Sequence, residues 1–206
     1  MVPINIDFLD TAGSVCESLL PTSRARDRIN GIEVTCIDNG MPVLVIPARS
    51  LGKTGYESPP ELDADRDFKA RLEKPRLAAG VLMGLGDVSH KVVPKMALIA
   101  PAQAGGHVCT RSFIPHRCHT AIGVLGAVSV ATACVMPGSV AEGIARITHG
   151  SPRVMSVEHP SGEFTVTLEV SGAGENFTVD RSGILRTARA LMRGEVLVPQ
   201  SVWDGR

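Results

Sequence analysis

The sequence predicts an α+β fold of many short β-strands together with one buried helix. Most of the chain has the pattern of short strands between turns: 21 Gly and 14 Pro supply turns, the apolar residues are mainly Val, Ile, Leu and Ala, and only 3% of the residues are aromatic. From Ala121 to Val135, by contrast, only Ser129 and Thr132 are even mildly polar. A helix that is apolar all round must be buried, so this run predicts a buried helix.

The first 50 residues are expected to form N-terminal strands and a hairpin. A β-rich run covers Ile4–Leu9 and leads into a turn-rich segment. Two further runs, Ile32–Ile37 and Val43–Ile46, flank Asn39-Gly40, and Asn-Gly between such runs is a strong hairpin signal. Pro42 favours an edge position for the second strand, because proline cannot donate to a sheet.

Residues 51–180 are expected to form the main barrel with its central helix. Glu61–Lys74 has the apolar spacing of an amphipathic surface helix. The buried helix is predicted over 118–135 and ends before Pro137-Gly138. The remaining strands are predicted at Lys95–Ala100, His107–Ile114, Val154–Glu158, Glu163–Val170 and Asn176–Arg181.

The C-terminal segment, residues 181–206, fits two patterns. Ile184, Leu185, Ala188, Leu191 and Met192 have helical spacing, whereas Glu195–Val198 has the composition of a strand. The residues alone leave helix and strand open here.

Composition excludes several classes of function. Lys+Arg and Asp+Glu balance at 21 each, so no nucleic acid or anionic membrane is expected as a partner. The apolar run is shorter than the ~20 residues that a membrane span needs. Five cysteines at irregular spacing, with no secretory signal, favour reduced thiols and a cytoplasmic protein.

Cys118 is the first candidate for chemistry. At the start of the predicted helix it would feel the positive end of the helix dipole, and Arg117 and His119 add positive charge, so we expect a lowered thiol pKa. The backbone N–H groups of His119, Thr120 and Ala121 could hold a substrate carboxylate. The alternative is a buried structural cysteine; the charged neighbours favour function.

The sequence gives less support to a zinc site or to a cofactor-binding site. Zinc would require Cys109, His116, Cys118 and His119, but their spacing contains neither CxxC nor HxxxH, so no metal is expected. The motifs of nucleotide cofactors and common hydrolases are also absent, so no cofactor is expected. A thiol, imidazoles and cations remain, which suit proton transfer next to a carboxylate.

Five long motifs resemble the PrpF-type isomerases. They are FLDTAGS (8–14), LLPT (19–22), NGIEVTCIDNGMPVLVIPA (30–48), LMGLGDVSHKVVPK (82–95) and TRSFIPHRCHTAIGVLGAVSVATA (110–133). The resemblance is strongest to the 4-oxalomesaconate tautomerases and weaker to the 2-methylaconitate isomerases.

The resemblance implies a diaminopimelate epimerase-like α+β fold, in which a mainly antiparallel β-sheet is wrapped round a central buried helix. It also implies a cofactor-free 1,3-proton shift in an unsaturated di- or tricarboxylic acid. Matching motifs assign substrate binding to Ser89, Lys91, Arg111, His116, Arg117, His119 and Thr120, with Cys118 as the acid or base. For the C-terminal segment the family favours strands.

The resemblance also implies that residues 1–206 correspond to the second half of a two-domain isomerase. The first half, which in the family supplies an acid/base lysine and a second cysteine, is then absent. We therefore expect this chain to be weakly active or inactive alone, with a homodimer or a separate chain completing the site. A non-catalytic remnant that binds carboxylates is the competing interpretation, and a zinc-stabilised domain is a minor one.

Overall fold

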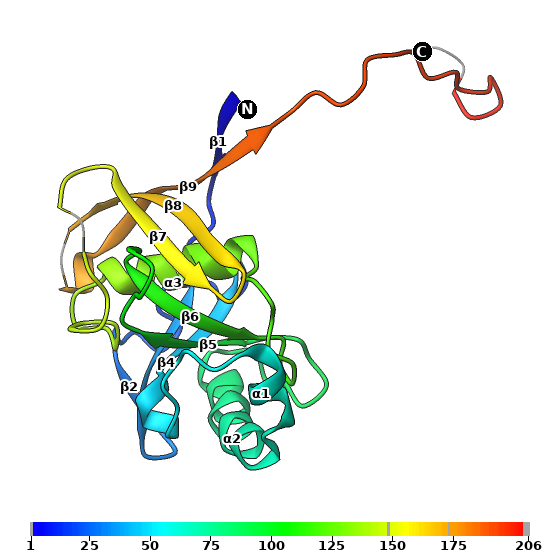
Figure 1. Cartoon of the computed structure of the whole chain (residues 1–206). Coiled ribbons are helices and arrows are strands. Elements are labelled where there is room, and N and C mark those ends of the chain that lie inside the picture. Colours follow the sequence, from blue (N-terminus) through cyan, green and yellow to red (C-terminus); the bar gives the residue numbers. More distant parts are fainter. Residues whose placement is uncertain (1, 148, 173, 204–206) are drawn as a thin grey trace.

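The computed structural model describes residues 2–147, 149–172 and 174–203, and within them nine strands form one sheet (Figure 1). Their order is β1-β9-β8-β7-β6-β5-β4-β3-β2. Neighbouring strands are antiparallel except in the pairs β4–β5 and β6–β7, which are parallel. The strands are β1 Val2–Phe8, β2 Asp27–Ile29, β3 Ile32–Asp38, β4 Pro42–Pro47, β5 Lys95–Ala100, β6 Val108–Phe113, β7 Arg153–His159, β8 Gly162–Ser171 and β9 Thr178–Ala188.

The described residues contain few helices. The α-helices are α1 Pro59–Ala64, α2 Arg66–Leu82 and α3 Val124–Val135, and short 3-10 turns cover Ala48–Leu51 and Gly174–Asn176. The amphipathic helix predicted over 61–74 is thus two helices that meet at Asp65. This residue ends α1, and its side chain accepts the Phe68 N–H to begin α2.

The predicted hairpin is present, but the edge position predicted from Pro42 is wrong. β3 and β4 pair antiparallel around Asn39-Gly40, and Gly40 has the positive φ (84°) that the turn requires. β4 is an interior strand between β3 and β5, with every residue buried. Pro42 is tolerated there because it is the first residue of the strand.

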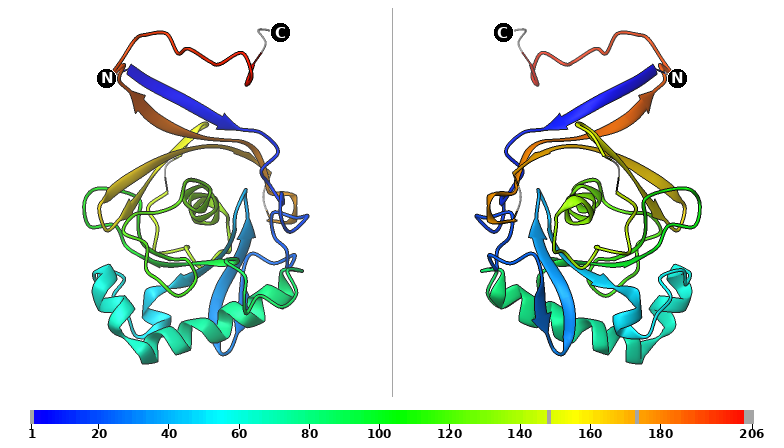
Figure 2. Two further views of the ribbon diagram at one scale, coloured as in Figure 1. Left: turned by 90° about the vertical axis from the view of Figure 1, so that its right-hand side faces the viewer. Right: turned by 90° about the vertical axis from the view of Figure 1, so that its left-hand side faces the viewer.

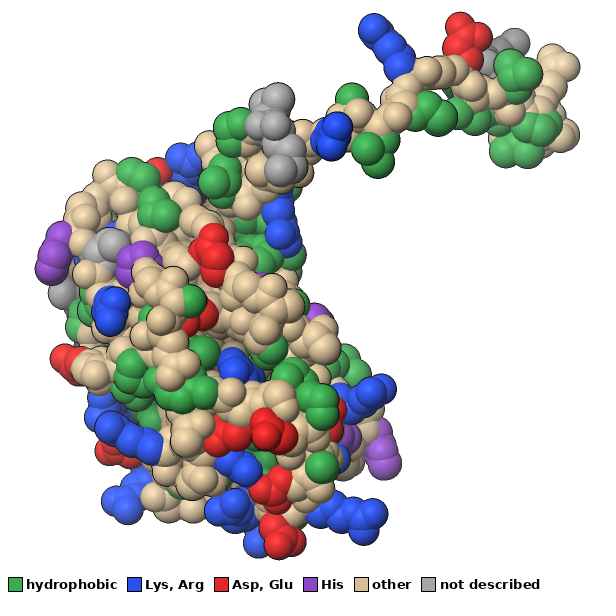
Figure 3. Space-filling view, in the orientation of Figure 1, with side chains coloured by type: hydrophobic (Ala, Val, Ile, Leu, Met, Phe, Trp, Pro, Cys, Tyr) green, Lys and Arg blue, Asp and Glu red, His purple; other side chains and the backbone are tan. Residues whose placement is uncertain are grey.

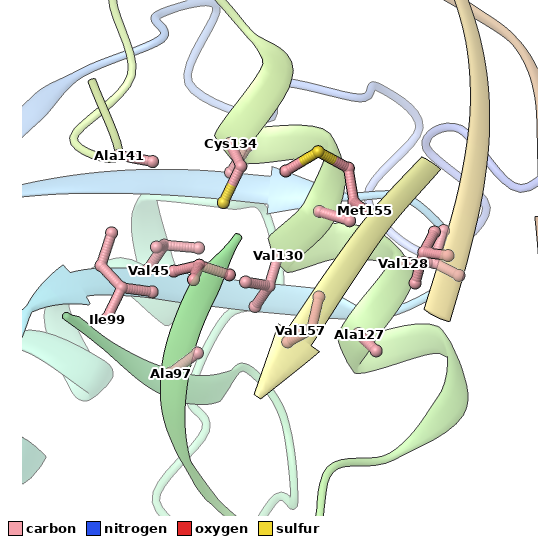
Figure 4. Packing of buried hydrophobic residues seen from close by; sticks show 14 of the residues in the cluster. Val45, Ala97, Ile99, Ala127, Val128, Val130, Cys134, Ala141, Met155 and Val157 are labelled. Atoms are coloured by element: carbon pink, nitrogen blue, oxygen red, sulfur yellow. The ribbon is translucent and has the colours of Figure 1, made fainter. Parts of the chain in front are cut away.

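α3 packs against strands from distant parts of the sheet. It contacts β3 and β4 as well as β7, β8 and β9, and Figure 2 shows strands on both sides of it. Its residues from Ala127 to Val135 are all buried. Figure 4 shows Val130 of this helix among Val45, Ala97 and Val157 from three different strands.

The other face of β3–β6 is covered by α1 and α2. Alternation along β5 places Ala97 and Ile99 in the cluster around α3. It places Met96 and Leu98 in a second cluster, which includes Leu62 of α1 and Phe68 of α2. The sheet therefore has helices on both faces over this region. Successive side chains along β6 point alternately towards α3 and towards α1 and α2.

β6 and β7 pair over two positions, Val108–Val157 and Cys109–Glu158. The distal half of β6, Thr110–Phe113, has no β7 partner in the described ladder. β6 and β7 are thus no longer paired along the half of β6 that carries Arg111 and Ser112.

The secondary structure of the C-terminal segment differs in part from the prediction. β9 continues as a strand to Ala188, so the helical spacing from Ile184 is misleading up to that point, and residues 189–203 form neither the helix nor the strand expected at Glu195–Val198. This segment extends away from the body with exposed apolar side chains, Leu191 and Leu197 each at 91% (Figure 3).

Among the residues that the structure describes, none of the helices combines the length and apolarity needed to cross a bilayer.

Candidate active site

The buried helix begins six residues later than predicted. α3 starts at Val124, with Gly123 at its N-cap position. The Cys118–Phe113 bridge and the 2.7 Å bond from the His119 N–H to the Ser112 carbonyl tie residues 114–119 back onto β6 instead. The expectation that Cys118 lies at the helix N-terminus is therefore wrong.

The actual N-terminus of α3 lines a cavity of about 240 Å³. Gly123 makes no side-chain capping bond, and no acidic residue lies in the first turn. The first N–H groups of a helix lack partners within the helix, so they are available to an anion. Lys95 at the start of β5 and Ser112 on β6 line the same cavity.

Lys95 is a half-buried cation at this cavity. In the described part of the chain no carboxylate lies within ion-pair distance of its ammonium group. Burial lowers the pKa of Lys95 below its usual range. A cation in this environment is well suited to bind a carboxylate or to exchange a proton.

A larger cavity, about 570 Å³, lies on the other side of β6. Arg111 and Cys109 line it from β6, and Glu158 and His159 line it from β7. Arg111 is 7% exposed, and its Nε donates to the Glu57 carbonyl at 2.6 Å. Burial, with His119 and Arg111 nearby, lowers the pKa of His159. Of the two predicted residues that lower the pKa of His159, Arg111 lines this cavity and His119 does not.

Cys118 is buried in the cluster beneath α1 and α2, on the face of the sheet opposite α3. Burial and, to a smaller extent, the Asp63 carboxylate raise the pKa of the Cys118 thiol to about 12, while Arg111 opposes this shift. The lowered pKa expected for Cys118 is therefore wrong, because the thiol is buried next to a carboxylate and does not lie at a helix N-terminus. The thiol is protonated at neutral pH.

Three predicted binding residues lie around α2 instead of in either cavity. Ser89 and Lys91 are exposed; the Ser89 N–H donates to Asp87 and the Lys91 ammonium donates to the Leu85 carbonyl. His116 is exposed, with Nδ1 3.7 Å from Glu73.

Sequence analysis missed the residue that organises this region. Arg76 is fully buried, pairs with both carboxylate oxygens of Glu73 and donates to the carbonyls of Val88, Lys91 and Val93. A basic residue on the apolar face of a helix would have indicated a buried ion pair. Arg76 lies two residues beyond the predicted end of that helix, at Lys74.

The remaining predicted residues have simple environments. Arg117 and Thr120 are exposed, and His119 is half-buried with its Nδ1 accepting the Ala121 N–H at 2.9 Å. Within the described ranges, no three His, Cys, Asp or Glu side chains gather as metal ligands. The four zinc-type residues weighed above do not form such a group.

Lys95, Ser112, Glu158 and His159 were also missed as site residues. Each lies at or near the end of a strand that was correctly predicted. The sequence does not show which strand ends lie next to one another, so it could not identify these residues as a group. Together the two cavities place cations on both sides of β6, which is an arrangement for binding carboxylates and stabilising negative charge.

The sequence matches the protein-family model described as "PrpF protein" over residues 1–199. It is 55% identical over 196 residues to the (4E)-oxalomesaconate Delta-isomerase of Novosphingobium sp., and 52% identical over 200 residues to the 4-oxalomesaconate tautomerase of Pseudomonas putida. These alignments cover 95% and 97% of this chain but 54% of each relative. The chain thus spans about half the length of the curated relatives it matches.

A solved structure, the crystal structure of methylitaconate-delta-isomerase, superposes with a TM-score of 0.83 at 24% identity. The superposition covers 95% of this chain and 55% of that one. At this identity the likeness shows a shared fold.

Proposed function

Because this chain belongs to the PrpF family, we propose that it acts as an isomerase of the 4-oxalomesaconate tautomerase type. The reaction would be a cofactor-free 1,3-proton shift in an unsaturated di- or tricarboxylic acid: one carbon loses a proton, the double bond moves, and the third atom gains a proton. The names of its relatives support this substrate class, and the diaminopimelate epimerase-like arrangement around α3 is part of the same proposal.

The observation that carries the proposal is the pair of cationic sites on β5 and β6. The uncapped N-terminus of α3 and Ser112 would bind one substrate carboxylate next to Lys95. Arg111, with His119 nearby, would bind another. Cations held in place before the reaction also stabilise the enolate that forms when a C–H proton leaves.

Lys95 is the proton-transfer group that we propose from this chain. Its lowered pKa brings the neutral amine closer to physiological pH, so it can accept and return a proton. Cys118, the candidate from the sequence, keeps a narrower role. With its raised pKa it can donate a proton but cannot act as a thiolate base. Ser89, Lys91, His116, Arg117 and Thr120 would contribute only to the outer approach of the substrate.

We further propose that the complete site requires the part of the relatives' length that this chain does not match. Both cavities are open, so a substrate held by this chain alone remains in contact with water. A second module, on another segment or another chain, would exclude water and supply the opposing proton-transfer group.

The test is an assay that follows the loss of conjugated keto-acid absorbance from 4-oxalomesaconate. The chain alone is expected to give no turnover, and mixing it with the unmatched part of the Pseudomonas putida relative is expected to restore it. Lys95→Met in the mixture should abolish turnover, whereas Lys74→Met, an exposed control on α2, should retain it. Robust turnover by the chain alone would contradict the second module. Carboxylate binding without turnover in any mixture would favour a non-catalytic binding module.

A further inference from the structure

Arg111 is a buried cation whose partners are all neutral. Its guanidinium donates to the carbonyls of Glu57 and Thr110 and to the sulfur of Cys109. Within the described chain its Nη2 makes no hydrogen bond, and no carboxylate lies within ion-pair distance. The other strongly buried arginine, Arg76, has Glu73 as a two-point partner. An unpaired buried charge is costly, so Arg111 is poised for an external anion.

A carboxylate of this protein does line the same cavity. Glu158 of β7 is 6% exposed and borders the cavity with Arg111. Its two oxygens are occupied: Oε2 accepts the Gln103 N–H at 2.8 Å, and Oε1 accepts the N–H groups of Ala104 and Gly106 at 2.7 and 2.8 Å. Burial alone would raise the pKa of Glu158, but these three bonds outweigh it and lower the pKa.

We propose that this amide cage, the three backbone N–H groups of Gln103, Ala104 and Gly106, holds the Glu158 carboxylate away from Arg111 and thereby keeps the guanidinium free to bind a ligand carboxylate. Glu158 is then a positioning residue. Without the cage, the Glu158 carboxylate, which lines the same cavity, would be free to pair with Arg111, and the cavity would lose its affinity for acids. This inference rests on the role of Arg111 in the proposed function.

The structure supplies two features that enforce this separation. A Cβ at Gly106 would lie 2.7 Å from the Glu158 Cγ and 2.9 Å from its Oε1, so only glycine lets the carboxylate seat in the cage. The backbone is also braced, because the Thr110 hydroxyl donates to the Glu158 carbonyl at 2.8 Å and the Thr110 carbonyl accepts from Arg111. The backbone of Glu158 and the side chain of Arg111 are therefore both held by Thr110 of β6.

The experiment measures malonate binding to the full chain by calorimetry. Malonate is a small dicarboxylate that can use the two-point geometry of a guanidinium. Gly106→Ala should displace Glu158 towards Arg111 and weaken binding by roughly tenfold or more. Adding Glu158→Gln to Gly106→Ala should restore binding, because the competing charge is gone. A general loss of loop structure would instead give additive losses.

Glu158→Gln alone should keep malonate binding while hydrogen exchange of the Gln103, Ala104 and Gly106 amides accelerates. The matched control is Glu163→Gln, a carboxylate of the same cavity that accepts bonds only from the Ser156 and Thr165 hydroxyls; it should leave those amides unchanged. Binding to Gly106→Ala within twofold of the parent, or a double variant no better than Gly106→Ala, would overturn the proposal, as would a parent chain that does not bind malonate. Failure of turnover with intact malonate binding would count against the isomerase alone.

Discussion

The Cys118 backbone N–H donates a 2.7 Å hydrogen bond to Oδ1 of Asp63. This bond joins the loop before α3 to helix α1, two segments 55 residues apart in the chain. It places a carboxylate beside a buried thiol that the sequence surrounds with Arg117 and His119. Burial and the Asp63 carboxylate, more than the adjacent Arg117 and His119, set the pKa of this thiol.

Asp63→Asn should lower the pKa of the Cys118 thiol, because it removes the neighbouring negative charge. The pKa should still stay above 9.0, because burial is the larger cause of the shift. The measurement is the alkylation rate of the Cys118 peptide against pH, by mass spectrometry. Asp67→Asn, in the first turn of α2, is the control and should leave the profile unchanged.

Stability should fall as the pH rises from about 9 to about 12. Burial raises the pKa of Cys118 and Cys134 from 9.0 to about 12, so the folded protein holds these thiol protons more tightly than the unfolded chain. Their contribution to folding is complete below pH 9 and is lost as the pH approaches 12. Urea unfolding across this range should show a smaller loss for Cys134→Ala than for the parent; an equal loss in both would contradict the assignment.

Arg76→Gln should destabilise the protein by about 3 kcal/mol or more, because it leaves Glu73 without its partner and three loop carbonyls without a donor. The loop that carries Ser89 and Lys91 should then exchange its amides faster. Urea unfolding and hydrogen exchange measure the two effects. Lys74→Gln, an exposed charge on the same helix, should change the unfolding free energy by no more than about 0.5 kcal/mol.

Lys95→Met should remove activity from the completed enzyme without destabilising the fold. The ammonium is half-buried, and none of the described carboxylates pairs with it, so folding gains nothing from its charge. Thermal unfolding is expected at the same or a higher temperature than in the parent, while kcat falls. A marked drop in unfolding temperature would show that Lys95 has a structural partner and would argue against its role in the site.

Asn39→Ala should cost about 3 kcal/mol. Its side chain joins three elements: it accepts from Thr11 and donates to Thr132 of α3 and Ser182 of β9, at 2.9 and 3.0 Å. Removing it takes a hydrogen-bond donor away from the buried hydroxyls of Thr132 and Ser182. The change in urea midpoint should greatly exceed that of Asn5→Ala on exposed β1; similar values would mean that the network adds little.

Local patterns predicted much of the secondary structure. Alternating apolar residues located β5 and β6, and Asn39-Gly40 located the turn between β3 and β4, because these signals depend on neighbours in sequence. The same patterns placed the start of α3 six residues early. Nothing local in 118–123 reveals that Ser112 captures the His119 N–H and keeps this segment out of the helix.

The sequence by itself determined most of the strands, the buried apolar helix and the family, and it predicted a set of side chains around β6 that bind carboxylates. Only the tertiary structure decided which of these side chains share a cavity. Successive residues of a strand point to opposite faces, so Arg111 and Ser112 line different cavities, and Arg111 shares its cavity with His159 of β7. Burial and distant partners such as Asp63 and Gln103 then set the charges, because solvation and Coulomb interactions depend on distance in space and not along the chain.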